Sequence, residues 1–532
     1  MDTDHREIEW QFDADDIHVV ADWLTAYPQD SAVNVGHPSS TMQVDTYLDT
    51  PDWRIYRAGY GLRVRRKGTA APPVATMKSI EEASVEGLRQ RREINETLAV
   101  GDASENIALL LSAQGEVGAR VRRVRGNSEL RELFETRTQR TVFALQVGSQ
   151  RIGEVDLDDT VVKGATPDRD IHMQRVEVEI ESGAEQTRAV NAFVRQMVKM
   201  CGLRSAEMSK FEAGLKARDL KPLQIQASDF GATGVKATTI GGMAWDVVRN
   251  NFAAILSYEC GARLGDDSEQ IHQMRVSIRR MRAAFRIFGD VLPQRIAKQA
   301  TELSWVAKEL GAVRDLDVMI ERTIAWSLES ADTTAFQTVA AWLIAERSEE
   351  FQRLLETLNS ERYAKFTTDF ARLLRKPFPG PAWAQAPALK AIPALIRQRY
   401  RKVRKLGDTL KPTSPATDFH RLRIKSKRLR YGLEFIEPLY GKPAKRALTE
   451  ASIMQDTLGY FQDAQVAIHR LRALSTSEHN RPSEATLAAF ATVIHRYGQA
   501  TANLLNDFPL AYAHLHGKPW KRLWKKMKAA IP

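Results

Sequence analysis

Short segments in which polar and apolar residues alternate recur through the first 218 residues of the chain. An alternation with a period of two is typical of half-buried β-strands. The pattern predicts strands over 7–12, 43–48, 60–66, 73–80, 87–98, 137–147, 151–162 and 174–181. Helical spacing interrupts them near 14–26, 104–114 and 186–201. This part of the chain is therefore expected to be β-rich.

The remainder of the chain has a different period. Apolar residues recur at helical spacing and strand signals are scarce. The spacing predicts helices over 244–264, 268–289, 295–328, 334–375 and 444–475. The chain is therefore expected to be an α+β multidomain protein with a β-rich first half and an all-α second half.

Composition narrows the class of protein. With 532 residues, 43% hydrophobic and 27% charged, the chain resembles an ordinary globular protein with a sizeable core. No apolar run reaches the roughly 18 residues that cross a bilayer, and the opening MDTDHREIEWQF does not resemble a signal peptide. Two cysteines are too few for a disulfide scaffold or a multi-cysteine zinc site. A cytoplasmic location is the natural expectation.

Charge divides the chain at about the same place as the hydrophobic pattern. The net charge is +11, but residues 1–218 hold 29 Lys and Arg against 35 Asp and Glu, and residues 219–532 hold 48 against 31. A change of this size suggests two functional halves. We expect domains at 1–218 and 237–532 with a linker at 219–236, which contains Pro222 and several glycines.

The second half contains an internal repeat. HQMRVSIRRMRAAFRIF at 272–288 aligns with HRLRIKSKRLRYGLEFI at 420–436, and the same offset of 148 residues superposes Asp315 on Asp463. Two helical halves, about 237–376 and 390–532, are the simplest explanation. A proline-rich stretch at 377–393 joins them.

Each repeat carries a stripe of basic residues. His272, Arg275, Arg279 and Arg282 step by three or four residues, so they share one helix face, and no acid lies between Ile271 and Gly289. In the second repeat His420, Arg423, Lys427 and Arg430 step in the same way. A bound polyanion would offset the repulsion within such a face. The alternative is an ordinary solvated face, or salt bridges to Asp315, Asp317 and Asp463. Further clusters lie at 397–405 and in the tail 518–528, whose tryptophans either pack into the bundle or face a membrane surface; packing is the favoured interpretation.

The His-x-x-Arg helix, its repeat and the Leu-Gly-x-x-x-Asp segments resemble the CHAD domain over roughly residues 237–532. The resemblance implies a helical domain with pseudo-twofold symmetry that binds inorganic polyphosphate through its basic faces. The residues implied are His272, Arg275, Arg279, Arg280, Arg282, His420, Arg423, Lys427, Arg428 and Arg430.

Charged residues in the first half recur two apart, which places them on one face of a strand. Glu7 pairs in this way with Glu9, and Glu177 with Glu179; Glu154, Asp156 and Asp158 repeat the spacing. Basic residues follow it in GLRVRR and elsewhere. A sheet closed into a barrel would gather these faces inside, where bases would hold phosphate and acids a hard cation such as Mg²⁺. An exposed sheet face with cross-strand ion pairs is the alternative.

The ordered series E-x-E, GLRVR, TMK, QRREIN, GEVDLDD, VEVEIESG and Met-Ser-Lys resembles the CYTH domain of the triphosphate tunnel metalloenzymes, over roughly 5–218. The resemblance implies an eight-stranded antiparallel β-barrel tunnel and, with the second half, a bacterial CYTH–CHAD protein similar to inorganic triphosphatases. It implies a Mg²⁺ or Mn²⁺ site and a phosphate cradle. The implied metal ligands are Glu7, Glu9, Glu154, Asp158, Glu177 and Glu179. The implied catalytic residues are Glu7, Glu9, Arg63, Arg65 and Lys78, and the implied substrate-binding residues are Arg91, Arg140 and Lys210.

One position departs from the family pattern. The opening motif of the family is E-x-E-x-K, whereas Gln11 stands at the third position here. Gln11 donates a hydrogen bond but carries no charge, which is expected to cost about 1–3 kcal/mol of phosphate stabilisation in a desolvated site. Arg66 or Lys67 could substitute, although strand alternation puts Arg66 out of phase with Arg65.

Several functions fit these patterns. The first is hydrolysis of the terminal phosphate of inorganic triphosphate with a divalent metal, coupled to polyphosphate binding. The second, for which Gln11 is the argument, is a weakly catalytic or non-catalytic polyphosphate-binding protein. A nucleic-acid binder fits worst because the basic stripes contain few aromatic residues for base stacking. A cyclase acting on ATP is a further family possibility.

Overall fold

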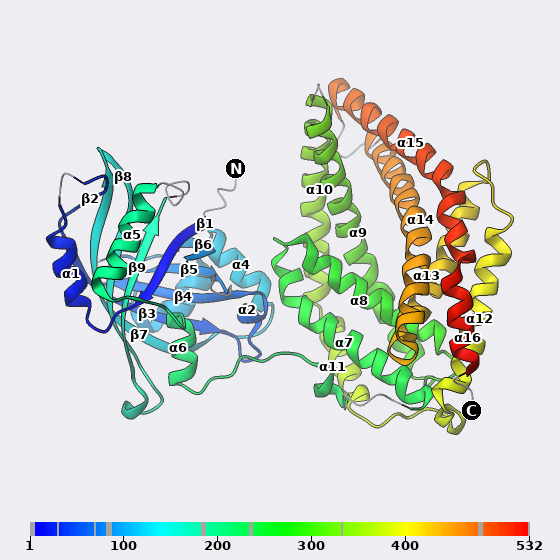
Figure 1. Ribbon diagram of the computed structural model, residues 1–532, viewed down its shortest axis with the longest axis horizontal. Helices are drawn as coiled ribbons and strands as arrows, with labels where there is room; N and C mark the ends of the chain where they lie inside the picture. The colour runs from blue at the N-terminus through cyan, green and yellow to red at the C-terminus, as the bar shows by residue number, and fades with distance from the viewer. Residues whose placement is uncertain are drawn as a thin grey trace. The chain divides into compact units, whose positions relative to one another are not determined.

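The structure is a computed structural model, and it describes residues 6–28, 31–68, 71–80, 88–181, 188–232, 238–330, 333–476 and 482–529. The chain divides into two compact units, residues 1–224 and 225–532 (Figure 1). The first is built on one β-sheet and the second on helices, so the expected α+β multidomain class is confirmed.

The sheet of the first unit closes on itself. Its strands run in the order β1 (Arg6–Asp13), β6 (Leu88–Thr97), β5 (Val74–Ser79), β4 (Tyr60–Lys67), β3 (Ser39–Asp49), β7 (Arg131–Val147), β8 (Gln150–Val162) and β9 (Ile171–Ile180). β1 also pairs with β9, and every pairing is antiparallel. Two short strands, β2 (Asn34–Val35) and β10 (Arg204–Ser205), extend the edges of β7 and β1. The predicted barrel is therefore present.

Apolar residues of the barrel strands face outward, and helices cover them. Val155 and Leu157 of β8 and Val176 and Val178 of β9 pack with helices α1 (Ile17–Thr25) and α5 (Arg188–Cys201). Helices α3 (Asn106–Ser112) and α4 (Glu116–Arg125) pack together, and α4 contacts β5 and β6. The short α2 (Arg54–Arg57) contacts β3, β4 and α4, and α6 (Lys210–Ala217) contacts β7, β8 and β9. Because the hydrophobic core lies outside the sheet, the inward face is left to polar side chains.

The second unit is helical throughout its named elements. It contains α7 (Ile240–Leu264), α8 (Ser268–Ile287), α9 (Ile296–Glu329), α10 (Thr334–Asn359), α11 (Glu361–Leu374), α12 (Ala388–Gly407), α13 (Ala416–Tyr440), α14 (Lys442–Ser475), α15 (Glu484–Ala513) and α16 (Lys518–Ala529). The single helix predicted over 334–375 is wrong. Ser360 is extended there, and its hydroxyl accepts a hydrogen bond from the amide of Tyr363, so it ends α10 and caps α11.

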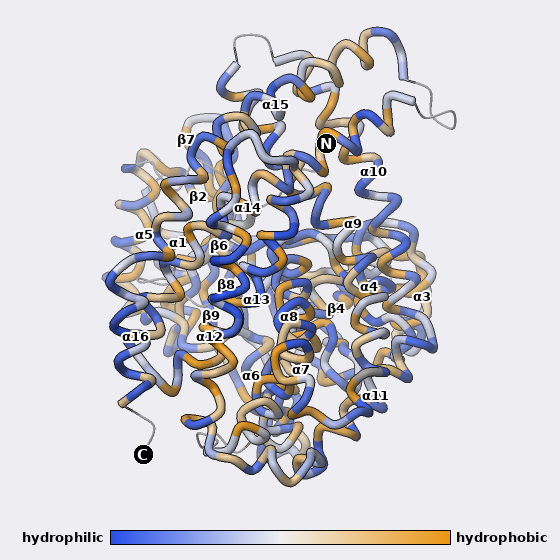
Figure 2. The backbone as a smooth tube through the Cα atoms, turned by 90° about the vertical axis from the view of Figure 1, so that its right-hand side faces the viewer, coloured by the Kyte–Doolittle hydropathy of each residue, from blue (hydrophilic) through white to orange (hydrophobic). Residues whose placement is uncertain are grey.

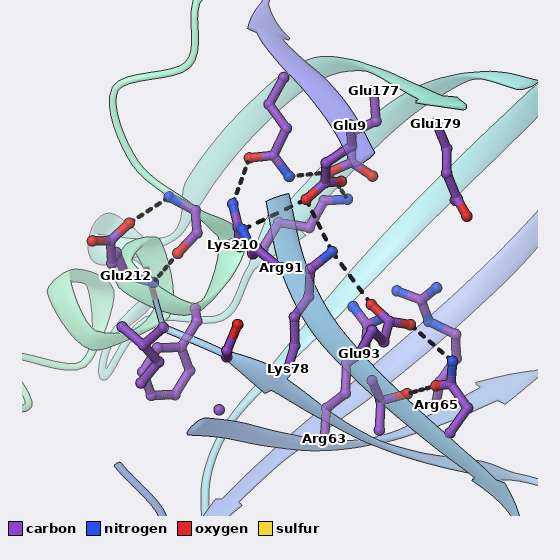
Figure 3. Close-up of a pocket in the computed structure, with 18 of the residues that line it drawn as sticks. Glu9, Arg63, Arg65, Lys78, Arg91, Glu93, Glu177, Glu179, Lys210 and Glu212 are labelled. Carbon is purple, nitrogen blue, oxygen red and sulfur yellow. Dashed lines mark hydrogen bonds and ion pairs between the residues drawn. The ribbon is translucent and has the colours of Figure 1, made fainter. Parts of the chain in front are cut away.

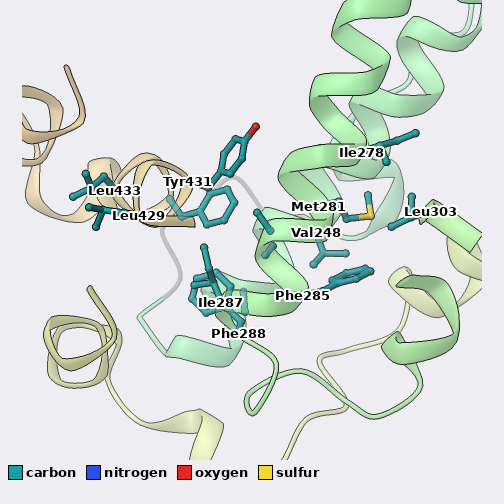
Figure 4. Packing of buried hydrophobic residues seen from close by; sticks show 14 of the residues in the cluster. Val248, Ile278, Met281, Phe285, Ile287, Phe288, Leu303, Leu429, Tyr431 and Leu433 are labelled. Atoms are coloured by element: carbon teal, nitrogen blue, oxygen red, sulfur yellow. The ribbon is translucent and has the colours of Figure 1, made fainter. Parts of the chain in front are cut away.

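One large hydrophobic core joins the two halves of the helical unit. Met281 of α8, Phe288 directly after it, and Leu429 and Tyr431 of α13 belong to it and are almost fully buried (Figure 4). Figure 2 shows hydrophilic and hydrophobic residues alternating along the helices and strands, as expected for elements with one buried and one exposed side.

The ends of this unit are anchored by aromatic packing. Trp520, Leu523 and Met527 of α16 are at most 2% exposed, so the packing interpretation of the tail is confirmed. Within the segment expected to be a linker, the short helix η5 (Ala227–Phe230) places the ring of Phe230 against Phe252. Across the described residues, no helix combines the length and apolar character that a membrane span requires.

Candidate functional site

The barrel encloses a charged cavity of about 1070 Å³ (Figure 3). Strand alternation sends Glu9 and Gln11 of β1 into it, and likewise Arg63 and Arg65 of β4. The other charged residues that line it are Lys78, Arg91, Glu93, Arg140, Arg151, Glu154, Glu177, Glu179, Glu181, Lys210 and Glu212. The alternative of an exposed charged sheet face is thereby excluded for these residues.

Acids and bases interleave along one wall of the cavity. The Lys78 ammonium lies 3.0 Å from Glu9 Oε1 and 3.3 Å from Glu93 Oε2. Arg65 donates two hydrogen bonds, of 2.7 and 2.8 Å, to the carboxylate of Asp45. Burial raises the pKa of Asp45, but Arg65 and Arg63 outweigh it and hold that pKa at about 2. Asp45 therefore stays ionised and fixes both arginine side chains.

A second network holds the opposite wall. Arg140 donates to Asp158 Oδ1 at 2.7 Å and to Glu177 Oε2 at 2.6 Å, and Lys210 lies 3.1 Å from Glu177 Oε1. Lys210 also bonds Asp158, which is fully buried. Although burial raises the pKa of Glu177, the charges of Lys210 and Arg140 bring it well below its usual range. Arg140 and Lys210 are thus each paired with two carboxylates of this wall, Asp158 and Glu177.

Three carboxylates lie close enough together to share a cation. Oxygen atoms of Glu154, Asp156 and Glu179 lie within 4.8 Å of one another. The register explains this, because Glu154 pairs directly with Glu179 across β8 and β9 and Asp156 is two residues further along. Burial, reinforced by neighbouring carboxylates, raises the pKa of Asp156 to about 7 and raises that of Glu179. Asp156 Oδ1 is buried without a hydrogen-bond partner among the described residues. This group fits a hard divalent cation, which would remove the repulsion.

The expected metal ligands are thus only partly brought together. Glu154 and Glu179 are in the cluster, where Glu154 also pairs with Arg151 and Asp156 Oδ2 with Arg140. Asp158 and Glu177 lie outside it and are bonded to both Arg140 and Lys210, and Glu9 is bonded to Lys78. The side chain of Glu7 lies outside the described part of the structure.

Gln11 occupies a central place in the cavity. Its side-chain amide donates to Glu177 Oε1 at 3.3 Å, and its carbonyl oxygen accepts from Arg91 Nη2 at 3.2 Å. Gln11 is 4% exposed and pairs with Glu177 across β1 and β9. Arg66 does not replace the missing charge, because it points away from the cavity and donates to Asn106 and to the carbonyl of Gly101.

Sequence reasoning missed Asp45 and did not place Asp156 among the metal ligands. Both lie at inward-facing positions of their strands, and Asp156 stands between Glu154 and Asp158, so strand alternation alone indicates that they face the cavity side. Arg137, three residues before Arg140 on β7, points outward and pairs with Glu135. The separation of three residues explains the difference, because an odd separation along a strand puts two side chains on opposite faces.

In the helical unit the two basic stripes meet. Arg275 of α8 lies 3.1 Å from Asp315, and its repeat equivalent Arg423 of α13 lies 3.7 Å from Asp463. The salt bridges considered as an alternative to polyanion binding are therefore present at Asp315 and Asp463. Asp317 instead bonds Arg347. Within the described residues, no carboxylate forms an ion pair with Arg279, Arg282, Lys427 or Arg428, so the stripes keep an excess of positive charge.

The pKa of Lys427 reflects how closely these cations are packed. Burial, followed by the charges of Arg423, Arg279 and Arg275, lowers the pKa of Lys427 to about 7. Burial and the charge of Arg314 also lower the pKa of His272. Since Arg279 and Arg275 come from α8 and Lys427 and Arg423 from α13, the two stripes form one surface.

The two halves differ at one symmetric position. Arg280 of α8 lies 2.6 Å from Glu434 of α13, and Arg430 lies 3.5 Å from the same carboxylate. In the repeat, Arg428 corresponds to Arg280 and Arg286 corresponds to Glu434. Burial lowers the pKa of Arg428, and the charge of Arg286 lowers it further. One side of the surface is thus closed by an ion pair, whereas the other presents two arginines.

Comparisons with known proteins match both units. A model of the CYTH domain family matches residues 23–213, and a model of the CHAD domain family matches residues 246–472. Similar solved structures include the CHAD domain from the plant Ricinus communis, 25% identical with a TM-score of 0.46, over 56% of this chain and 97% of that one. PptA from Streptomyces chartreusis is 17% identical with a TM-score of 0.42, over 52% and 99%. HpAC1 from Hippeastrum, a candidate adenylyl cyclase described as having a dominant triphosphatase activity, is 20% identical with a TM-score of 0.31, over 40% and 96%.

Proposed function

We propose that this chain, which consists of a CYTH domain followed by a CHAD domain, hydrolyses inorganic triphosphate in its tunnel and binds inorganic polyphosphate on its helical unit. The observation that carries the first part is the composition of one cavity. It combines a cradle of arginine and lysine side chains with Glu154 and Glu179, whose carboxylates cluster with that of the buried Asp156 behind them. Phosphoryl transfer from a phosphoanhydride needs these two elements and no covalent nucleophile.

The metal site of this proposal consists of Glu154, Asp156 and Glu179, which have the donor chemistry that Mg²⁺ or Mn²⁺ requires. When bound there, the ion would neutralise charge on the phosphate oxygens. Glu177 and Asp158 are bonded to Arg140 and Lys210, and Asp156 Oδ2 is bonded to Arg140, so substrate that drew these cations away would free all three carboxylates.

The remaining chemistry is assigned to side chains of the cavity. Arg63, Arg65, Lys78 and Arg91 on one wall, with Arg140 and Lys210 on the other, would bind phosphate oxygens and orient the chain. Glu9, which is 2% exposed, would orient an attacking water. The cradle stabilises charge that develops on the leaving phosphate, which is the main demand of this reaction.

The test is phosphate release from triphosphate, ATP and long-chain polyphosphate with and without Mg²⁺ or Mn²⁺. Wild type should act on triphosphate only with the metal, and Glu154→Gln combined with Glu179→Gln should abolish that turnover. Arg137→Gln is a matched control, because this charged residue lies on the outward face of the same barrel. Turnover without any metal, or full activity in the double variant, would refute the assignment.

A second candidate is a tunnel that binds triphosphate-like anions with little or no turnover. The position of Gln11 favours it, because its amide occupies the place of a family lysine and ties up both Arg91 and Glu177. Metal-dependent triphosphate binding without phosphate release would support this candidate.

The polyphosphate assignment rests on the surface shared by α8 and α13. A linear polyphosphate has no sequence to read, so a continuous positive surface suffices for binding, and its affinity should fall steeply with salt. Reversing charge at Arg279 and Lys427 should weaken binding far more than the same change at Arg353 and Arg372. Equal losses would mean that net charge alone is responsible.

A further inference from the structure

A second basic groove lies between α12 and α16, on residues that the stripes do not include. The groove has a volume of about 720 Å³. Its lining consists of Lys390, Pro393, Ala394, Arg397, Gln398, Arg401, Lys402, Lys405, Met527 and Lys528. No carboxylate is among these lining residues.

The two helices run antiparallel here and seal their apolar sides against each other. The ring of Tyr400 lies 4.6 Å from that of Trp520, and the Arg397 guanidinium lies 5.6 Å from the ring centre of Trp524. Further along, Met527 reaches the groove beside Pro393. Because Trp520 and Met527 are at most 2% exposed, the apolar face of α16 is already used by the bundle.

The cations of the groove have no acidic partners in the part of the chain that the structure describes. Neither helix contains Asp or Glu. Within the described ranges, no ion pair links a carboxylate to the groove cations Lys390, Arg397, Arg401, Lys402, Lys405 or Lys528. Arg404, on another side of α12, shows the contrast, because it pairs with Asp408 at 3.1 Å.

Four of these cations form a line. Lys390, Arg397, Arg401 and Lys405 are spaced by seven, four and four residues, which keeps them on one face of α12. Ala394, which has a small side chain, occupies the position of this face between Lys390 and Arg397. At 1.5 Å per residue the line extends over about 22 Å. Like charges at this spacing repel each other along an isolated helix, so the line is most stable with an elongated anion beside it.

We infer that this groove binds a second segment of linear inorganic polyphosphate, separate from the stripes on α8 and α13; the inference rests on the proposed polyphosphate binding of the helical unit. Single-stranded nucleic acid fits less well because none of the lining residues is aromatic and its bases would find no stacking partner. A membrane surface fits less well because the groove is concave, Trp520 of α16 is buried in the bundle, and Trp524 is half-buried with Arg397 over its ring.

The experiment measures how many short polyphosphate chains bind to the full-length protein by isothermal titration calorimetry. Two triple variants and one double variant are compared with wild type. The groove variant is R401Q/K405Q/K528Q, the stripe variant is R279Q/K427Q, and the control variant is R353Q/K365Q/R372Q. The control side chains are 53%, 75% and 68% exposed and lie on α10 and α11, so the same charge is removed elsewhere.

Wild type and the control should bind two short chains, and the groove and stripe variants one each. With a chain long enough to occupy the groove, the groove variant should also make the salt dependence of log K shallower by about 2, as expected for three lost phosphate contacts. The inference would be overturned if the groove variant still bound two chains, or if the control variant also lost one bound chain. If only the groove variant lost a bound chain and the stripe variant still bound two, the proposed role of the stripes would instead be refuted.

Two further probes decide the identity of the ligand. An oligothymidine or a vesicle containing anionic lipid should not compete with polyphosphate for the groove at equal phosphate concentration. Competition by either one that the groove variant abolishes would replace polyphosphate with that ligand and overturn the assignment.

Discussion

Replacing Gln11 with lysine should increase metal-dependent triphosphate turnover. The side chain is 4% exposed, and its amide lies between Arg91 Nη2 at 3.2 Å and Glu177 Oε1 at 3.3 Å. Lysine cannot accept the hydrogen bond from Arg91, so that guanidinium would be released toward the substrate, and a new ammonium would face the same space.

The size of the effect follows from the charges around the position. A unit charge 4 Å from a phosphate oxygen contributes about 4 kcal/mol at an effective dielectric constant of about 20. Repulsion from Arg91 and the desolvation of the new ammonium oppose this, while Glu177 favours the ammonium. A net stabilisation of about 1–3 kcal/mol in the transition state remains, which corresponds to about 5- to 150-fold in kcat/KM.

The assay is phosphate release from triphosphate at saturating Mg²⁺ or Mn²⁺, comparing wild type with Gln11→Lys, Gln11→Met and Gln11→Glu. Methionine keeps the length of the side chain without charge or hydrogen bonds and should not raise turnover. Glutamate adds a carboxylate beside Glu177 and should lower it. Unchanged or reduced turnover in a folded Gln11→Lys variant, at every concentration of metal, would refute the reasoning.

Three further outcomes are expected. Because the pKa of Lys427 is lowered to about 7, its ammonium is charged at pH 6 and largely neutral at pH 8, so polyphosphate affinity should fall several-fold over this range. Lys427→Arg should flatten that part of the pH profile of affinity, and an unchanged profile in this variant would contradict the assignment to Lys427. Asp156→Asn should remove one carboxylate of the cluster, so the variant should bind Mn²⁺ more weakly in a metal titration. Because that buried carboxylate costs free energy in the metal-free protein, the metal-free variant should melt at an equal or higher temperature. Tighter Mn²⁺ binding would contradict the proposed metal cluster. In Gly214→Ala the new methyl group would lie 2.0 Å from the Phe134 ring, so urea unfolding should show a loss of about 1–3 kcal/mol, together with reduced turnover because α6 carries Lys210; an unaltered unfolding midpoint would show that the ring moves aside freely.

Local periodicity was sufficient to predict most of the strands and helices and many of the residues that face the cavity. Alternation along a strand sorts side chains onto two faces without knowledge of the rest of the fold, and this placed Glu9 with Gln11 and Arg63 with Arg65. The repeat of 148 residues likewise predicted two equivalent basic helices. Local pattern failed at Ser360, where one capping hydroxyl divides a stretch whose hydrophobic spacing runs through.

The sequence alone therefore determined which faces are charged, and the tertiary structure decided which charges meet. The metal cluster depends on the register of β8 and β9, since a shift of one residue would move Glu154 away from Glu179 and turn every side chain to the other face. The low pKa of Lys427 and the contact of the two stripes depend on the packing of α8 against α13. Pairing partners, burial and the resulting pKa values arise from distances between segments far apart in the chain, and no local pattern contains those distances.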